Sequence, residues 1–64
     1  MYKNKMRQFR KEQGISLAEL AARTGLSSGY LCHLEKGSRK NPSSKVMDII
    51  SKELKKTVDE VFYE

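Results

Sequence analysis

The sequence predicts an all-α fold made of five short helices. Apolar residues recur at steps of three and four along most of the chain, which is the period of a helix face, and no stretch alternates as a strand does. A serine or threonine precedes four of these stretches and a glycine follows three of them, as at helix starts and ends. Because a chain of this size buries only about 60% of its unfolded surface, we expect a single domain over residues 1–64.

The first helix is expected to run from Tyr2 to Gln13. Tyr2, Met6, Phe9 and Gln13 recur at steps of four, three and four, and the first three form an apolar stripe. Gly14 follows at once and favours the left-handed conformation in which many helices end. The stripe therefore indicates a helix that covers one side of the core.

The second helix is expected to begin after Ser16 and to end near Thr24. Ser16 and Glu19 have the spacing of a capping box, in which each side chain accepts a hydrogen bond from the backbone N–H of the other residue. Gly25 ends the helix after barely two turns. The turn that follows is short, so this helix and the next must pack closely at a steep angle.

The third helix, from the Ser27 cap to Gly37, has two faces of different character. Leu31 and Leu34 are three residues apart and share the face that we expect to point inward. The opposite face and its flanks carry no large aliphatic side chain and consist of Ser28, Gly29, Tyr30, Cys32, His33 and Lys36. Small and hydrogen-bonding groups of this kind suit the floor of a DNA groove.

Two more helices are expected after a basic loop at residues 38–42. Ser43 caps the fourth helix, and its apolar stripe consists of Val46, Ile49, Ile50 and Leu54, widened by Met47. Thr57 and Glu60 form a second capping box. That box starts a terminal turn or two, with Val58, Val61 and Phe62 on one side.

The positive charge of the chain is concentrated in two segments. The net charge is +5, and residues 1–11 hold five basic residues and no acidic one. Residues 36–45 hold four more basic residues without an acid, directly after the third helix. A polyanion is the partner that this pattern favours, whereas a merely solvated surface is the plainer alternative.

Several classes of protein are excluded by what the sequence lacks. One cysteine allows no internal disulfide and no four-cysteine zinc site, which fits a reducing cytoplasm. Cys32 and His33 are neighbours that point about 100° apart on a helix, and no second cysteine or histidine completes a metal site or a catalytic pair. No apolar run approaches the roughly 20 residues of a membrane span. We expect a soluble cytoplasmic protein that is not an enzyme and needs no metal or cofactor.

The order and spacing of these motifs resemble those of a known family. The residues that carry the resemblance are Phe9-Arg10, Gly14-Ile15-Ser16, Glu19-Leu20-Ala21, Gly25-Leu26-Ser27, Leu34-Glu35-Lys36-Gly37, Pro42-Ser43, Leu54 and Asp59-Glu60-Val61-Phe62. From about Asn4 to Phe62 the chain is similar to the phage repressor and Cro-type (xenobiotic-response-element-like) helix-turn-helix family. The resemblance implies a compact five-helix repressor-like domain whose second and third helices form the helix-turn-helix.

The resemblance also implies a DNA-binding surface, with base contacts from the start of the third helix and phosphate contacts from the start of the second and from the basic loop. The residues matched to it are Ser16, Leu17, Ser27, Ser28, Gly29, Tyr30, Cys32, His33, Lys36, Ser38, Arg39, Lys40, Asn41 and Ser44. Among them Ser28, Gly29 and His33 are expected to reach base edges. The family further implies a buried ion pair between Arg10 and Glu35.

Three of these positions depart from the family pattern, and each leaves an alternative open. Gly29 replaces a hydrogen-bonding side chain, either to let DNA approach closely or through drift. Tyr30 replaces a small hydroxyl residue, so that its phenol reaches a phosphate or its ring covers the core. Leu17 replaces a glutamine that binds phosphate, and the contact then passes to the helix N-terminus or to Ser16. His33 is itself either a base contact or an idle surface residue.

We therefore expect a sequence-specific transcriptional regulator, a repressor that binds double-stranded DNA as a dimer on a near-palindromic operator. One short reading helix spans too few base pairs to select a promoter, so two copies should act together. The residues left for joining them are Val58, Val61 and Phe62, with Tyr63 at the rim, although part of this group must also cover the core. The alternatives are an antitoxin or accessory partner of another protein, and a basic adaptor without sequence preference.

Overall fold

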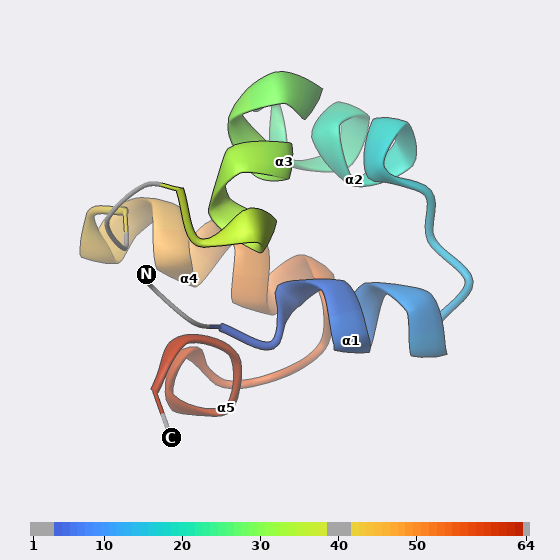
Figure 1. Cartoon of the computed structure of the whole chain (residues 1–64). Coiled ribbons are helices and arrows are strands. Elements are labelled where there is room, and N and C mark those ends of the chain that lie inside the picture. The colour runs from blue at the N-terminus through green and yellow to red at the C-terminus, as the bar shows by residue number, and fades with distance from the viewer. Residues whose placement is uncertain (1–3, 39–41, 64) are drawn as a thin grey trace.

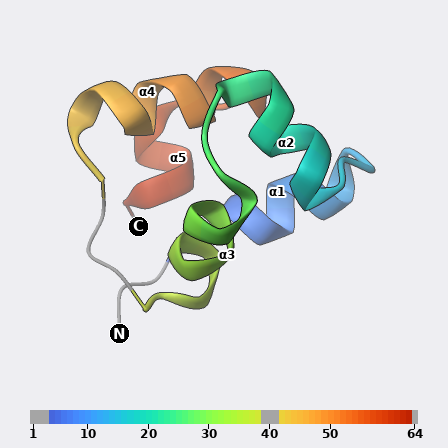
Figure 2. The same ribbon diagram turned by 90° about the horizontal axis from the view of Figure 1, so that it is seen from above.

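The computed structural model describes residues 4–38 and 42–63, which form five α-helices and no strand (Figure 1). The helices are α1 (Met6–Glu12), α2 (Leu17–Thr24), α3 (Ser28–Lys36), α4 (Ser44–Glu53) and α5 (Val58–Phe62). Both views place α2 beside α3 and α5 beside α4 (Figures 1 and 2). The prediction of an all-α, five-helix fold is confirmed.

The helix starts follow the predicted caps. Four hydroxyl groups accept a hydrogen bond from the backbone N–H three residues further on, those of Ser16, Ser27, Ser43 and Thr57. Within residues 4–38 and 42–63 the capping box is complete only at Thr57, whose N–H donates to Glu60 Oε1. At Ser16 the prediction of a full box is wrong, because the Glu19 carboxylate pairs with Arg23 one turn further along α2.

The start of α1 differs from the prediction. The helix begins at Met6, and Tyr2 lies outside the described residues. Asn4 joins this start to the rest of the molecule, because its Oδ1 accepts a hydrogen bond from the Met6 N–H (3.1 Å) while its Nδ2 donates to the Leu34 carbonyl at the end of α3 (2.8 Å). The Lys5 N–H donates to the carbonyl of Val61 in α5 (2.7 Å). The segment before α1 is thus hydrogen-bonded to both α3 and α5.

The core receives side chains from all five helices. Its buried members are Met6, Phe9, Ile15, Leu20, Leu31, Leu34, Met47, Ile50, Leu54, Val61 and Phe62. Leu31 and Leu34 point inward as predicted, with relative exposures of 0% and 1%. The turns after α2 and α3 pass through Gly25 and Gly37, both at φ of 75°, a left-handed conformation that glycine adopts without steric cost. The turn at Gly25 brings α3 back across α2, and the turn at Gly37 ends α3.

The buried face of α4 is rotated from the predicted stripe. Met47, Ile50 and Ser51 are buried, whereas Val46 and Ile49 are only half-buried. Met47, Ile50 and Leu54 follow steps of three and four, so they share one face, and Ser51 lies on that face beside them. The prediction counted aliphatic residues alone and therefore overlooked a serine that is 1% exposed.

The residues predicted for a dimer contact lie at the end of the chain, and the structure places them in two different settings. Val61 and Phe62 are 1% and 4% exposed and belong to the core of their own chain. They therefore offer little surface to a second copy. Val58 is half-buried and Tyr63 is 50% exposed, so these two alone of the predicted set stay accessible. The short chain needs Val61 and Phe62 to close the core between α1 and α4.

Candidate nucleic-acid interface

The outward face of α3 is polar, as predicted. Ser28, Gly29, His33 and Lys36 are exposed, and so is the Ser27 cap. A Cβ atom placed on Gly29 would meet no atom within 4 Å, so no packing inside the chain requires a glycine there. The side chains on this face are neutral or basic, and none of them is a carboxylate.

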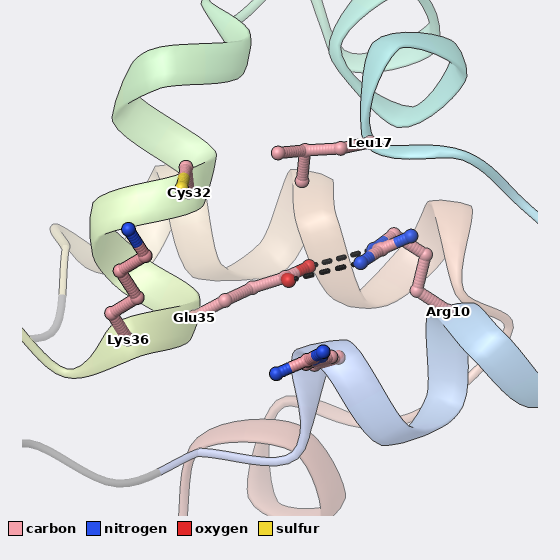
Figure 3. A pocket seen from close by; sticks show the side chains of 6 residues that line it. Arg10, Leu17, Cys32, Glu35 and Lys36 are labelled. Carbon is pink, nitrogen blue, oxygen red and sulfur yellow. Dashed lines mark hydrogen bonds and ion pairs between the residues drawn. The ribbon is translucent and has the colours of Figure 1, made fainter.

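An ion pair with α1 fixes the orientation of α3. Arg10 Nε and Nη2 donate to Glu35 Oε2 and Oε1 at 2.8 and 3.1 Å (Figure 3). Arg10 Nη1 donates to the Ile15 carbonyl at 2.9 Å. The two side chains are only 12% and 7% exposed, which confirms the predicted buried pair. The hydrogen bond to Glu35 raises the pKa of Arg10 above its ordinary value, against the smaller opposing effect of burial.

This pair also decides the charge of the α3 surface. Glu35 is the one acidic residue of the helix, and its carboxylate points to Arg10 rather than to solvent (Figure 3). Two directional hydrogen bonds between rigid groups hold α1 and α3 in one relative orientation. The interior pair therefore leaves the exposed side of α3 without negative charge.

The start of α2 lies next to this pair. Leu17 is the first residue of α2, is half-buried against the core, and its side chain lies above the Arg10–Glu35 pair beside Cys32 (Figure 3). Ser16, which caps the helix, is exposed. The first N–H groups of a helix have no partner within it and favour anions. The geometry brings Ser16 and Leu17 to the same side of the molecule as the end of α3.

A pocket of about 270 Å³ opens between α1, α2 and α3. Its lining consists of Arg7, Arg10, Leu17, Cys32, Glu35 and Lys36. Three of the six were predicted as interface residues, and Arg7 of α1 was missed. The signal that identifies Arg7 is its spacing, because it lies three residues before Arg10 and therefore on the same side of α1.

The remaining predicted residues lie in different settings. Tyr30 packs half-buried against the core, which agrees with the alternative in which its ring covers apolar surface. Cys32 is half-buried, and Ser38 and Ser44 are exposed. Arg39, Lys40 and Asn41 lie outside the described residues. A contact between DNA and any of these residues stays a prediction.

Two further searches cover residues 4–38 and 42–63. Within those ranges no three His, Cys, Asp or Glu side chains gather in a way that would hold a metal ion. None of the helices in this part of the chain has both the length and the apolar character needed to cross a membrane.

The short α2, the tight turn at Gly25 and the exposed polar face of α3 define a helix-turn-helix domain. The model of the helix-turn-helix family, of the Cro/C1 type, matches residues 6–61. The chain belongs to this family, as its motifs predicted.

Similar proteins are transcriptional regulators. SinR of Bacillus subtilis (strain 168), an HTH-type transcriptional regulator, is 37% identical over 51 residues, which is 80% of this chain and 46% of SinR. This chain thus spans about half the length of that curated relative. These relatives are transcriptional regulators and not enzymes, which agrees with the prediction that the chain is not an enzyme.

Two solved structures show the same fold. The crystal structure of the biofilm regulator SinR in complex with DNA superposes with a TM-score of 0.79 at 37% identity, over 84% of this chain and 86% of that one. A complex of SinR with the protein SinI superposes with a TM-score of 0.80 at 36% identity, over 86% of this chain and 53% of that one.

Proposed function

We propose that the chain is a sequence-specific DNA-binding transcriptional regulator, a repressor whose single DNA-binding domain comprises residues 1–64. The observation that carries the proposal is the charge of α3, whose one carboxylate is held inside by Arg10 while His33 and Lys36 face outward. The similarity to SinR, a relative solved in complex with DNA, supports the same function. Such a regulator acts where the DNA is, and in a bacterium the DNA lies in the cytoplasm.

Base readout is assigned to the first two turns of α3. His33 offers a ring nitrogen that donates to guanine N7 or O6, and Ser28 offers a hydroxyl that both donates and accepts. Gly29 lies one turn before His33 on the same face, and the open space at its Cβ position admits a thymine methyl group or the sugar edge. Lys36, at the far end of α3, is assigned to a phosphate and carries no sequence information.

Selecting one promoter takes more base contacts than one short reading helix can make, so the proposed regulator acts as a dimer on a near-palindromic operator. Two reading helices about 34–36 Å apart would contact half-sites about 10 base pairs apart on one face of DNA. Of the described residues, Tyr63 is the large hydrophobic residue that stands exposed at the surface, and Val58 lies half-buried near it in the chain. The contact is small, so we expect a weak dimer that forms mainly on DNA.

Selection of bound sites from random duplex DNA tests the proposal. We expect two half-sites related by a twofold axis, and strong preference of the chain for that site over a scrambled duplex. His33→Ala should lower this preference and should weaken binding to scrambled DNA only slightly. Failure to enrich any sequence would reject specific binding and favour the basic adaptor. Tyr63→Glu should remove cooperativity on the full site, and retained cooperativity would move the dimer contact elsewhere.

A second candidate function, the antitoxin or accessory partner of another protein, is favoured by one observation. A relative of this chain, SinR, has been solved in complex with a second protein, SinI. Affinity capture with the tagged chain tests this candidate, because a stoichiometric partner that stays bound in the absence of DNA would support it. Recovery of the chain alone would leave the regulator as the function.

A further inference from the structure

We propose that the pocket between α1, α2 and α3 binds one phosphate group of the DNA backbone, and that Arg7 is the contact contributed by α1. The inference rests on the proposed function and deepens it, because the phosphate contacts expected from the sequence lie on α2, α3 and the following loop. A residue of α1 that approaches the same strand adds a fourth element to the interface.

The charge of the pocket favours an anion. Arg10 and Glu35 neutralise each other at its base, and each of the three guanidinium nitrogens of Arg10 already donates a hydrogen bond, to Glu35 or to the Ile15 carbonyl. Arg7 and Lys36 are exposed, and neither side chain forms an ion pair or hydrogen bond with any residue in the part of the chain that the structure describes. Two free cations therefore share one small opening.

The size and lining of the pocket suit a phosphate. Its volume is about 270 Å³, which is ample for one phosphate group and stands at the small end of the roughly 300–1,000 Å³ of small-molecule sites. Leu17 and Cys32 contribute uncharged side chains to the same lining. Uncharged side chains beside an anion lower the local dielectric constant and so strengthen its attraction to Arg7 and Lys36.

The second basic hollow of the molecule differs in that two of its three cationic side chains already have partners, while the third, Lys55, is exposed. It is lined by Gln13, Ile15, Arg23, Lys55 and Lys56. Arg23 already pairs with Glu19, and the Lys56 ammonium lies 4.8 Å from the centre of the Phe9 ring. It also lacks any residue of α3. This hollow carries no equivalent proposal, and its Arg23 provides a matched control.

The ion pair gives Arg7 a defined place relative to the reading helix. Arg7 lies about one turn from Arg10 on α1, and Arg10 is fixed to Glu35 of α3. A phosphate held by Arg7 therefore lies at a set position from His33. Such a contact fixes the register of α3 on the duplex without reading sequence.

The test compares variants on a random-sequence duplex of 24 base pairs, so that no operator is needed. Binding of wild-type chain, Arg7→Gln, Arg7→Lys and Arg23→Gln is titrated at several salt concentrations. Each lost phosphate contact lowers the slope of log K against log salt by about 0.9, which corresponds to about eightfold weaker binding near 0.1 M salt. We expect this change per subunit for Arg7→Gln, none in slope for Arg23→Gln, and a retained slope for Arg7→Lys.

The outcomes separate this inference from the proposed function. A wild-type chain that binds with a steep salt slope, together with Arg7→Gln that behaves as Arg23→Gln does, would overturn the phosphate site and leave the regulator intact. A wild-type chain without salt-dependent binding to any duplex would overturn both. Thermal melting of each variant confirms that the exposed substitutions leave the fold in place.

Discussion

The two sides of the core are held together by different kinds of interaction. Between α1 and α3 the contact includes a buried arginine and a buried glutamate that share two hydrogen bonds. Between α4 and α5 it consists mainly of apolar residues, chiefly Ile50, Val61 and Phe62, with one long hydrogen bond from the Tyr63 hydroxyl to Met47 Sδ (3.9 Å). Ser51 of α4 is buried and its hydroxyl has no hydrogen-bond partner among the described residues. The first contact depends on two short charged hydrogen bonds, and the second depends mainly on apolar burial.

This difference follows from what each helix has to do. Apolar burial is proportional to area and tolerates small rotations, whereas a two-bond guanidinium–carboxylate contact allows one relative orientation. In the proposed function α3 must be aimed at base edges, while α5 has only to cover the core. The costly polar contact therefore occurs where orientation matters, and the predictions below test the two sides in turn.

The largest effect is expected from breaking the ion pair. Glu35→Ala leaves Arg10 buried without its partner, which typically costs about 3–5 kcal/mol. A domain of this size has a free energy of unfolding of about 3–10 kcal/mol in total. We expect the variant to be largely unfolded at 37 °C, as measured by circular dichroism during thermal melting.

The control for this prediction replaces both partners. Arg10→Met combined with Glu35→Leu removes both charges and fills their volume, so it should lose far less stability than Glu35→Ala. If the proposed role of the pair is correct, the double variant stays folded yet binds selected DNA more weakly. Melting of Glu35→Ala within a degree or two of wild type would contradict the burial of the pair.

The opposite sign is expected at Ser51. Its hydroxyl is buried without a partner, and such a group costs about 1–3 kcal/mol of desolvation. Ser51→Ala removes that cost at the price of a small cavity, so we expect a gain of about 1–2 kcal/mol in the free energy of unfolding, measured with urea. Ser44→Ala, at an exposed position of the same helix, is the control and should change stability little. A loss of stability in Ser51→Ala would show that the hydroxyl has a partner in solution.

Local features of the fold could be predicted from the sequence, whereas the contact between distant residues could not. Caps and glycine ends are local, so Ser27, Thr57 and Gly37 indicated their helix boundaries correctly. The Arg10–Glu35 contact joins residues 25 apart, and only the family resemblance implied it. Its confirmation shows that a charged residue on an apolar face needs a partner from another element.

The failures have an equally physical origin. Glu19 satisfies its charge with Arg23 rather than with the Ser16 N–H, because a longer side chain one turn away competes with the cap. The sequence could not show how far Val61 and Phe62 are buried in the core of their own chain, because helical periodicity cannot tell a core face from an interface. Their part in a dimer stays a prediction. Arg7 was missed since a cationic residue on α1 acquires meaning only when Lys36 is brought to the same pocket.

A smaller effect is expected at Gly29, where the stability of α3 and its proposed contact with DNA favour different residues. Glycine within a helix costs up to about 1 kcal/mol relative to alanine, and a Cβ atom at this position meets no other atom. Gly29→Ala should therefore raise the melting temperature and weaken binding to the selected duplex. The same duplex titrated with Ala22→Gly, at an exposed position of α2, is the control for altered helix stability. Unchanged affinity of Gly29→Ala would show that the missing side chain has no role at the interface.

The smallest effect is expected at the cap of α5 and depends on pH. Hydrogen bonds from Thr57 lower the pKa of Glu60 below its ordinary value of 4.5. Because the folded state favours the ionised carboxylate, its contribution is present above about pH 4.5 and is lost as the pH falls through the lowered pKa. Glutamine retains an acceptor for the Thr57 N–H but no charge, so Glu60→Gln should melt slightly below wild type at pH 7, and the gap should narrow as the pH falls below 4.5. The difference between the two proteins cancels the titration of all other carboxylates. A gap in melting temperature that stays the same from pH 7 down to the lowest pH at which both proteins remain folded would mean that the charge of Glu60 does not contribute to the stability of the cap.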